Sequence, residues 1–424
     1  TKELRFPHSV GLLYSAFTAF LGFEVNEGEY KVMGMAPYGV PRYVDKVREV
    51  VRQYDDGSIE LDMSCFSFHH SARCMFSSKF ERIFGPPRES EAPFFPDDSR
   101  SPGIEGAATR SIYGLSQDNQ YYADLAASVQ EVAEEILLTM ARVLRANTEM
   151  ENLCIAGGVG LNSVANGRIL KESGFERLYI QPAAGDSGGA LGAALHVYHG
   201  LLGQSRKFQM RHACWGASYG QDEIKEFLDS KSVAYDTCLD EIDTADRTAD
   251  LLAEGKVVGW FQDRFEWGPR ALGNRSILAD PGRTDMRSKV NAKVKFREAF
   301  RPFAPSALAE RAHEYFDLAR PTEQDPARFM LLVSNVKEDK QSAIPATTHV
   351  DGSARPQTVF ESESPKFHSL INAFERRTGL PVVLNTSFNL RGEPIVATPA
   401  NAYRTFVRSE MDALVMGDCI VKKN

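Results

Sequence analysis

The sequence predicts a two-domain protein of the α/β and α+β classes, and three observations support that prediction. The chain has 424 residues, about three times the commonest domain size. In its first half, a short apolar strand, a glycine turn and a helix occur twice within about fifty residues, which is typical of layered α/β folds. In its second half, strand-like apolar runs alternate with helical patterns after a polar stretch over 200–218. We therefore expect an α/β domain over residues 1–204 and an α/β or α+β domain over 215–424.

Each predicted element rests on a local pattern of residues. Apolar residues recur every three or four positions over 122–145, which predicts an amphipathic helix. Short apolar runs at 152–156 and 178–180 lead into glycine turns and predict strands, and the small residues of 191–198 predict a helix. Further helices are predicted at 222–228 and 242–254, and further strands at 257–261, 329–333 and 380–384. The segment 85–109 is rich in Pro, Ser, Glu and Asp, which predicts a mobile surface loop.

Composition excludes several classes of protein. The 49 basic and 57 acidic residues give a net charge of −8, which provides no general attraction for nucleic acid or anionic lipid. No apolar run reaches the length of a membrane span, and the N-terminus lacks the pattern of a secretion signal. The six cysteines form no C-x-x-C pair, so we expect reduced, structural thiols. A cytoplasmic protein without nucleic-acid or membrane partners is predicted, and an oligomer is compatible with this composition.

Two glycine turns in the first half are candidate nucleotide-binding sites. Glycines after a strand let backbone N–H groups approach a phosphate, and the positive end of the next helix adds attraction. Any α/β protein needs tight turns, so one such cluster carries little weight, whereas two favour nucleotide binding. Asp186 lies among the glycines of the second turn, where a carboxylate is a candidate metal ligand. The candidate binding residues are Gly157, Gly158, Asn162, Gly185 and Gly188.

Basic residues gather between positions 270 and 301 of an otherwise acidic chain. Arginine forks match the geometry of phosphate oxygens, and lysine adds a point charge. Most charge runs are solvated helix faces, but aromatic residues interleave with this one, which favours a half-buried anion pocket. The candidate catalytic residues are Arg270, Lys295 and Arg297, and the candidate binding residues are Asn274, Arg275, Ser276 and Arg301.

Two polar clusters further along the chain are suited to hold phosphate or ribose oxygens. Short Ser and Asn side chains at the end of a strand offer donors and acceptors of the right size. Ordinary turn chemistry explains either cluster equally well when it is taken alone. The candidate catalytic residues are His349, Ser387 and Asn389, and the candidate binding residues are Arg355, Gln357, Asn385 and Thr386.

Several of these segments together resemble the signature blocks of the NodU/CmcH/TobZ carbamoyltransferases. The blocks occur in the family's order along nearly the whole chain, which makes the resemblance far more specific than a single glycine loop. They cover 28–39, with the candidate binding residue Lys31, and 157–162, 185–190, 267–276, 295–305 and 385–389. The resemblance implies a first domain similar to the Kae/TsaD branch of the actin-like ATPase (ASKHA) fold. It implies a second domain similar to the YrdC/Sua fold, which forms carbamoyl-adenylate.

The resemblance also implies an activity and the residues that carry it. Such enzymes form carbamoyl-adenylate from carbamoyl phosphate and ATP with Mg²⁺, and then transfer the carbamoyl group to a hydroxyl of a small natural product. The K-x-R signature of YrdC-like sites falls on Lys295 and Arg297, and the S-x-N signature falls on Ser387 and Asn389. Asp186 resembles the family's aspartate ligand to iron, so the resemblance implies Fe²⁺ or a similar divalent metal in the first domain.

The sequence departs from this family on its N-terminal side. Family members carry an H-x-x-x-H pair for the metal and a first phosphate loop, and no H-x-x-x-H occurs in this sequence. We therefore expect a truncated chain, a cleaved N-terminal lobe or a separate polypeptide that supplies this lobe. Alternative activities are threonylcarbamoyl modification of tRNA, hydrogenase-maturation carbamoyl transfer, and noncatalytic nucleotide binding. The negative net charge argues against the first, the missing cysteine pairs argue against the second, and the intact K-x-R and S-x-N pairs argue against the third.

Overall fold

The computed structural model describes residues 2–92, 94, 117–297, 300–318 and 326–423. They form two compact units, one with Thr1–Cys154 and Gly158–Leu178 and the other with Ile155–Gly157 and Tyr179–Asn424. The sequence predicts a boundary between 204 and 215, whereas the contacts assign residues 179–204 to the second unit. Most of the predicted mobile loop, from residue 95 to 109, lies outside the described residues.

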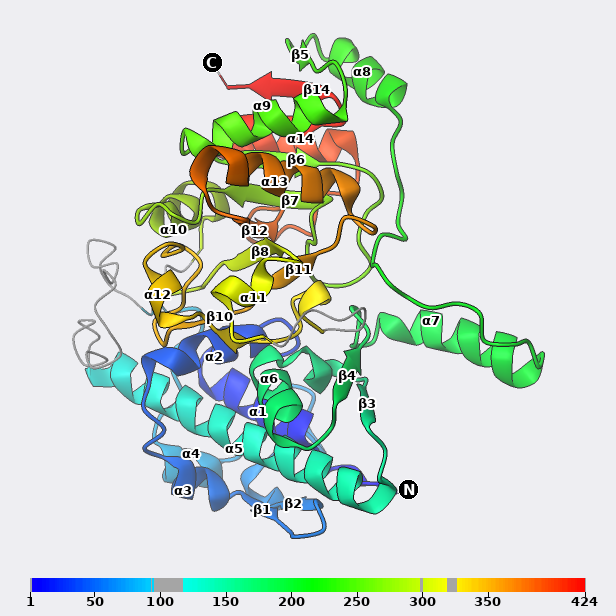
Figure 1. The fold of residues 1–424 in the computed structure, drawn as a ribbon. Helices are drawn as coiled ribbons and strands as arrows, with labels where there is room; N and C mark the ends of the chain where they lie inside the picture. Colours follow the sequence, from blue (N-terminus) through cyan, green and yellow to red (C-terminus); the bar gives the residue numbers. More distant parts are fainter. Residues whose placement is uncertain (1, 93, 95–116, 298–299, 319–325, 424) are drawn as a thin grey trace. The chain divides into compact units, whose positions relative to one another are not determined.

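The long helix α5 (Gln117–Thr148) organises the first unit (Figure 1). It contacts the short helix η1 (Ala36–Tyr38) and the helices α1 (Val10–Phe20), α2 (Glu29–Met35), α3 (Val44–Arg48) and α6 (Ser163–Glu172). Within α5, Leu125, Val129, Val132 and Ile136 are buried at helical spacing, so the predicted amphipathic helix is confirmed.

Short elements complete the first unit. Phe17 of α1 packs edge-on against Phe80 and Phe84 of α4, with ring centroids 5.0 and 5.1 Å away. The predicted strands at 152–156 and 178–180 are confirmed as β3 and β4, which pair with each other, and the boundary between the units passes through them. The bounds are η1 (Ala36–Tyr38), β1 (Val51–Gln53), β2 (Ile59–Leu61), η2 (Met63–Cys65), α4 (Ser78–Phe84), β3 (Asn152–Ile155), η5 (Gly158–Leu161) and β4 (Arg177–Ile180).

An eight-stranded mixed sheet forms the centre of the second unit, in the order β11-β8-β12-β7-β6-β13-β14-β5. The pairs β8–β11 and β6–β13 are parallel, and the other neighbouring pairs are antiparallel. The bounds are β5 (Asp236–Thr237), β6 (Val258–Phe261), β7 (Arg275–Ala279), β8 (Ala304–Leu308), β11 (Gln357–Val359), β12 (Val382–Ser387), β13 (Ala413–Met416) and β14 (Cys419–Lys422). A separate two-stranded sheet joins β9 (Ser334–Asn335) and β10 (Ser353–Ala354).

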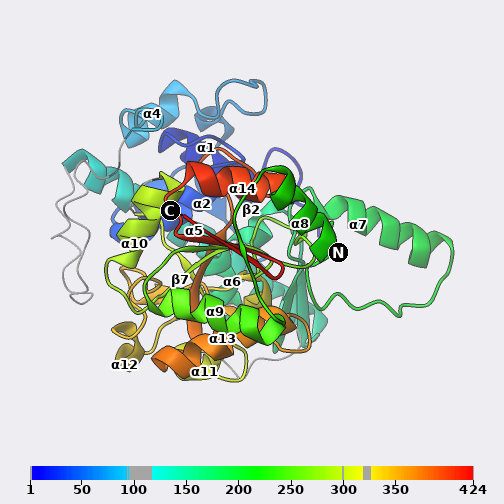
Figure 2. The ribbon, with the colours of Figure 1, turned by 90° about the horizontal axis from the view of Figure 1, so that it is seen from above.

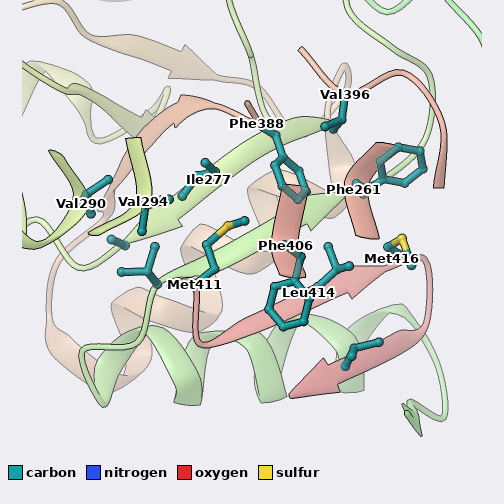
Figure 3. Close-up of a cluster of buried hydrophobic side chains, with 14 of the residues drawn as sticks. Phe261, Ile277, Val290, Val294, Phe388, Val396, Phe406, Met411, Leu414 and Met416 are labelled. Atoms are coloured by element: carbon teal, nitrogen blue, oxygen red, sulfur yellow. The ribbon is translucent and has the colours of Figure 1, made fainter. Parts of the chain in front are cut away.

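Helices cover both faces of the large sheet (Figure 2). Helices α9 and α13 pack against each other over one face, whose core includes Trp260, Leu278 and Val383. Helices α8, α10 and α14 contribute to the core on the other face, where Ile277 and Phe388 are buried (Figure 3). The bounds are α7 (Gly188–Leu195), η6 (His196–Leu201), α8 (Gln221–Ser230), α9 (Glu241–Ala253), α10 (Met286–Lys289), η7 (Val290–Lys295), α11 (Ala312–Tyr315), η8 (Pro326–Phe329), α12 (Glu338–Gln341), α13 (Pro365–Thr378) and α14 (Pro399–Arg408).

Most of the elements predicted from the second half are confirmed, and one is wrong. The helices predicted at 191–198, 222–228 and 242–254 correspond to α7 with η6, α8 and α9, and the strands at 257–261 and 380–384 correspond to β6 and β12. The apolar run 329–333 is not a strand, although its first four residues are buried. Its first residue, Phe329, ends the short helical turn η8, and the next residue, Met330, has φ +56°, which interrupts an extended backbone. The apolar pattern there reports burial rather than extension.

None of the helices in the described ranges has both the length and the apolar character that a bilayer span requires. The longest, α5, is amphipathic, so its length serves packing within the first unit.

Candidate functional site

The candidate site lies at one end of the eight-stranded sheet. Ser387, the last residue of β12, pairs with Ser276 near the start of β7. Asn385 pairs with Ala304 at the start of β8, and β11, which is parallel to β8, begins at Gln357. Because β12 runs antiparallel to β7 and β8, its C-terminal end and the N-terminal ends of β7, β8 and β11 share one end of the sheet. Residues distant in sequence therefore gather there.

Lys295 brings the two predicted signatures into direct contact. Its Nζ atom donates to the backbone oxygen of Ser387 at 2.7 Å and lies 3.2 Å from the Ser387 hydroxyl. The same atom donates to the side-chain oxygen of Asn389 at 2.6 Å and to the backbone oxygen of Asn389 at 3.0 Å. The Ser387 hydroxyl in turn donates to the Asn389 side-chain oxygen at 2.7 Å. The lysine is only 4% exposed, so this ammonium is fixed inside the unit.

Arg297 is oriented by contacts on two sides. Its Nε atom donates to the side-chain oxygen of Asn291 at 2.8 Å, and one of its terminal nitrogens donates to the backbone oxygen of Pro302 at 3.3 Å. The guanidinium carbon lies 4.6 Å from the ring centroid of Phe303, within cation–π range. Asn291 is buried on η7, so the helix that carries Lys295 also positions the arginine.

Arg355 lies close to three other arginines. Burial, followed by the positive charges of Arg270, Arg297 and Arg301, lowers the pKa of Arg355 well below its usual range. The buried Nε atom of Arg355 has no hydrogen-bond partner among the described residues. Four guanidinium groups that repel one another are stabilised when an anion with several charges binds between them.

Lys295 belongs to the same electrostatic group. Burial, followed by the charges of Arg297 and Arg301, lowers its pKa well below the usual range, and the negative charge of Glu393 opposes this effect. We call the five basic residues the cationic cluster: Arg270, Lys295, Arg297, Arg301 and Arg355. The predicted basic region over 270–301 and the later Arg355 thus converge at the same end of the sheet.

Asn385 and Gln357 are engaged within the protein. The Gln357 side-chain oxygen accepts from the Ser306 hydroxyl at 2.6 Å and from the Asn385 amide at 3.1 Å. The Gln357 amide donates to the backbone oxygen of Leu272 at 2.7 Å. Thr386 points to the other face of β12, because neighbouring residues of a strand alternate. The structure therefore places Asn385 and Gln357 in a buried hydrogen-bond network with Ser306 and the backbone of Leu272.

Arg275 is also engaged by the protein itself, although it is close to Arg270 in sequence. It is fully buried and donates to the backbone oxygens of Gln262 and Asp263. Its guanidinium carbon lies 3.7 Å from the ring centroid of Phe261, and burial lowers its pKa to about 10. Arg275 therefore joins strand ends and is not part of the cationic cluster.

The neighbours of Arg275 stabilise the same turn. Asn274 donates through its side-chain amide to the backbone oxygen of Arg264 at 2.7 Å. The Ser276 hydroxyl accepts from the backbone N–H of Gly273 at 3.1 Å. Asn274 thus joins the segment before β7 to the backbone at residue 264, and Ser276 binds the backbone at residue 273.

His349 lies in the turn before β10. Its Nδ1 atom is 3.7 Å from a carboxylate oxygen of Asp351. Burial opposes ionisation of Asp351, but hydrogen bonds from His349 and Ser353 hold the pKa of Asp351 well below its usual range. The contacts described for His349 are within this turn, so its predicted catalytic role stays a prediction.

The glycine turns have local geometric reasons for their residues. Gly157 has φ +104°, a conformation that favours glycine, and its N–H donates to the Ala184 backbone oxygen at 2.8 Å. A Cβ atom on Gly188 would approach the Ala183 oxygen to 2.3 Å, so a larger residue does not fit. The N–H of Gly188 donates to the Gly185 oxygen at 3.0 Å, while Gly158 has open space around its Cα.

Two predicted binding residues of the first unit also have protein partners. Asn162 caps α6, because its side-chain oxygen accepts from the Ala165 N–H at 3.1 Å, and its amide donates to the Gln130 side-chain oxygen at 3.2 Å. Lys31 forms an ion pair with Glu91 at 3.1 Å. These contacts are compatible with a structural role for both side chains.

Asp186 is exposed on the second glycine turn. No three His, Cys, Asp or Glu side chains within the described ranges are grouped so that they could hold a metal ion. The residues present therefore do not form an iron site by themselves, and Asp186 as a metal ligand stays a prediction.

Three residues that matter to the site's geometry were not among the predicted ones. Asn291 orients Arg297, and Glu393 accepts from the Asn389 amide through its backbone oxygen at 2.6 Å. Glu266 accepts three backbone hydrogen bonds from residues 272, 274 and 275. Glu266 directly precedes the motif 267–276, and Glu393 lies four residues after the motif 385–389, but their roles depend on backbone partners that a residue pattern does not reveal.

Two models of known protein families match the chain. A family model described as carbamoyltransferase N-terminus matches residues 1–195, and one described as carbamoyltransferase C-terminus matches residues 249–423. The chain belongs to the carbamoyltransferase family. The predicted resemblance and the predicted transferase class are thereby confirmed at the level of the family, and the mixed α/β fold is confirmed by the structure.

Relatives of this carbamoyltransferase chain extend beyond it. An uncharacterized Synechocystis protein is 44% identical over 99% of this chain and 68% of its own length. Nodulation protein NolO of Bradyrhizobium diazoefficiens is 40% identical over 99% of this chain and 70% of its own length. The 3'-hydroxymethylcephem-O-carbamoyltransferase of Streptomyces clavuligerus is 34% identical over 68% of this chain and 52% of its own length.

Proposed function

We propose that this chain is an ATP-dependent O-carbamoyltransferase whose second unit forms carbamoyl-adenylate. The observation that carries the proposal is the cationic cluster, in which Lys295 is fixed by oxygens of Ser387 and Asn389. Arg297 and Arg301 act electrostatically on both Lys295 and Arg355. Carbamoyl phosphate and ATP are both polyanions, so bringing them together requires fixed positive charge that offsets their repulsion. An end of a sheet with this many basic side chains is suited to that task.

The proposed reaction is balanced with one molecule of water. Carbamoyl phosphate and water give carbamate and phosphate, and a carbamate oxygen then attacks the α-phosphorus of ATP. The bond from that phosphorus to the β-phosphate oxygen breaks, so carbamoyl-adenylate and diphosphate form. A hydroxyl of the acceptor next attacks the carbamoyl carbon, and AMP leaves. The hydroxyl proton passes to a base.

Each cluster residue has a role in the first stage of this proposal. Arg355 and Arg270 bind the phosphate group of carbamoyl phosphate, since guanidinium forks match its oxygens. Arg297, held by Asn291 and Phe303, stabilises charge that develops on the phosphates of ATP. Lys295 adds a fixed charge close to the same phosphates. Mg²⁺ enters as part of the ATP substrate complex and neutralises phosphate charge.

For the second stage, we propose that the first unit has the ASKHA-type fold and receives carbamoyl-adenylate. The acceptor is a hydroxyl of a small natural product, a class that the name of the Streptomyces relative supports. Iron at Asp186 would need further ligands from outside the described residues.

The experiment that tests the proposal measures AMP. The chain is incubated with carbamoyl phosphate, Mg²⁺ and ATP labelled at the α-phosphate, and the nucleotide products are separated. We expect formation of AMP and diphosphate that depends on carbamoyl phosphate. In a Lys295→Ala variant, the rate of AMP formation should fall by about 10²-fold or more. Lys289→Ala is the matched control, because Lys289 lies on α10 and its amine binds Asp412 at 3.2 Å.

Two results would overturn the proposal. One is release of ADP instead of AMP, which places cleavage at another phosphate. The other is AMP formation in Lys295→Ala at the rate of the Lys289→Ala control, which removes the cationic cluster from the reaction.

A further inference from the structure

Backbone N–H groups of the segment 271–275 are bound by the side chain of Glu266. One carboxylate oxygen of Glu266, Oε1, accepts from the N–H of Leu272 at 2.8 Å, of Asn274 at 2.9 Å and of Arg275 at 3.2 Å. A single carboxylate oxygen thus fixes three peptide groups within four residues. We call residues 270–275 the arginine loop, because Arg270 is its first residue.

Other side chains hold the carbonyl groups of the arginine loop. The indole N–H of Trp260 donates to the backbone oxygen of Gly273 at 2.8 Å. Gly273 has φ +110°, and a Cβ atom there would collide with Phe367, so the loop has little room to move. The remaining bonds run from Gln357 to the Leu272 oxygen at 2.7 Å and from Asn385 to the Ala271 oxygen at 3.4 Å.

A buried glutamate at position 266 is unfavourable for the free energy of folding. It is 4% exposed, and its second carboxylate oxygen, Oε2, has no hydrogen-bond partner within the described part of the chain. Burial of a carboxylate with one unpartnered oxygen is unfavourable for stability. We therefore look for a functional role of Glu266 in the position at which it holds the arginine loop.

Repulsion within the cationic cluster explains why the position of Arg270 has to be fixed. The positive charge of Arg270 contributes to lowering the pKa of Arg355, so the two guanidinium groups repel each other. A flexible loop would relieve the repulsion by moving Arg270 away, and an anion would then have to bring it back. A loop fixed by Glu266 keeps Arg270 in place beforehand, which lowers the entropic cost of binding.

We propose that Glu266 is a positioning residue that acts through Arg270 and sets the affinity of the cationic cluster for carbamoyl phosphate. The inference rests on the function proposed above, which it deepens. It assigns to Glu266 no contact with substrate. Its consequence is that loss of Glu266 weakens substrate binding only while Arg270 is present.

The test is a double-mutant cycle on binding. The dissociation constant of carbamoyl phosphate is measured by isothermal titration calorimetry without ATP, for Glu266→Ala and Glu266→Gln, each with Arg270 and with Arg270→Ala. We expect Glu266→Ala to raise the dissociation constant about tenfold or more, since bonds to a charged acceptor are strong. Glu266→Gln keeps a side-chain oxygen and should lie between. With Arg270→Ala present, either change should alter binding by less than about twofold.

A second readout and a matched control make the test specific. Hydrogen exchange of the amides at 272, 274 and 275 should speed up in Glu266→Ala. Asp280→Asn is the control, because Asp280 is a buried carboxylate that accepts from the Gly282 N–H at 2.8 Å at the opposite end of β7. This variant should leave the affinity for carbamoyl phosphate unchanged.

The inference is overturned if Glu266→Gln and Glu266→Ala bind carbamoyl phosphate as tightly as the parent chain. It is equally overturned if they weaken binding by the same factor in the Arg270→Ala background, since Glu266 would then not act through Arg270. Failure of the proposed function looks different: carbamoyl phosphate binds in the predicted order of variants, but the chain forms no AMP.

Discussion

Asn389 holds Lys295 with two different oxygens, at 2.6 Å from its side chain and at 3.0 Å from its backbone. Two further oxygens from Ser387 complete the set. An ammonium has three N–H groups, so four oxygen neighbours saturate it. Lys295 therefore acts on a phosphate through its field, or by exchanging one protein oxygen for a substrate oxygen, and the S-x-N pair fixes where that charge sits.

Replacement of Lys295 by arginine should reduce AMP formation as much as removal of its charge does. The planar guanidinium cannot place one nitrogen among four oxygens. We expect Lys295→Arg and Lys295→Met each to reduce AMP formation about 10²-fold or more. Single-turnover assays with labelled ATP check this, and near-normal activity of Lys295→Arg would show that charge alone is sufficient.

Arg355 should show opposite effects on stability and on activity. Its Nε atom is buried without a partner among the described residues, and three arginines lower its pKa. We expect Arg355→Met to raise the free energy of unfolding by about 1–3 kcal/mol and to abolish AMP formation. Arg328→Met is the contrast, because Arg328 is buried in an ion pair with Glu363. It should lower the free energy of unfolding by about 3–5 kcal/mol, and chemical denaturation compares the two.

Anion binding to the cationic cluster should be accompanied by proton uptake. In the free protein, burial and the nearby arginines lower the pKa of Lys295, and a bound anion raises it again. The complex therefore holds more protons than the free protein, so affinity for carbamoyl phosphate should fall as pH rises toward the usual lysine pKa of about 10.4. Calorimetry in buffers of different ionisation enthalpy should report proton uptake, and less of it in Lys295→Met. Proton release on binding would contradict the assignment.

The residue types of the site could be predicted because K-x-R and S-x-N place charge and short polar groups at fixed spacing. Lys295 and Asn389 are close in the structure as the motifs imply. The sequence could not separate Arg270 from Arg275, which have the same chemistry and nearly the same neighbours. They differ because Arg275 begins β7, and strand alternation turns it toward Phe261. Prediction of that strand would have revealed the difference.

The apolar run at 329–333 illustrates a second limit. Its residues are buried, as their hydrophobicity suggests, but hydrophobicity alone does not decide between a strand and a packed loop. Met330 has a left-handed backbone although it is not a glycine, so no residue type in the sequence marks this turn. Asn385 and Gln357 show the same limit for polar residues, since buried amides serve a backbone and a ligand equally well.

Gln357 should affect stability more than chemistry. Its side chain accepts from Ser306 and donates to the Leu272 oxygen, so Gln357→Ala leaves buried polar groups without partners. We expect a loss of about 1–3 kcal/mol in the free energy of unfolding and a smaller change in the rate of AMP formation at saturating substrate. Denaturation and steady-state kinetics measure the two effects. A large loss in the rate of AMP formation with an unchanged free energy of unfolding would show that Gln357 binds substrate.

Asn162 should behave as a helix cap of the first unit. Its side-chain oxygen accepts from the Ala165 N–H at the start of α6, and its amide donates to Gln130 of α5. The same oxygen also accepts from the Gln130 amide at 3.1 Å. Asn162→Ala loses all three bonds, and we expect α6 to be destabilised by about 1–2 kcal/mol. Asn162→Asp keeps the two bonds that the side-chain oxygen accepts and loses the one donated to Gln130, so it should destabilise α6 less. Hydrogen exchange of the α6 amides separates this local effect from global unfolding. Equal exchange in the parent and both variants, together with weaker ATP binding in Asn162→Ala, would show that Asn162 serves the nucleotide instead.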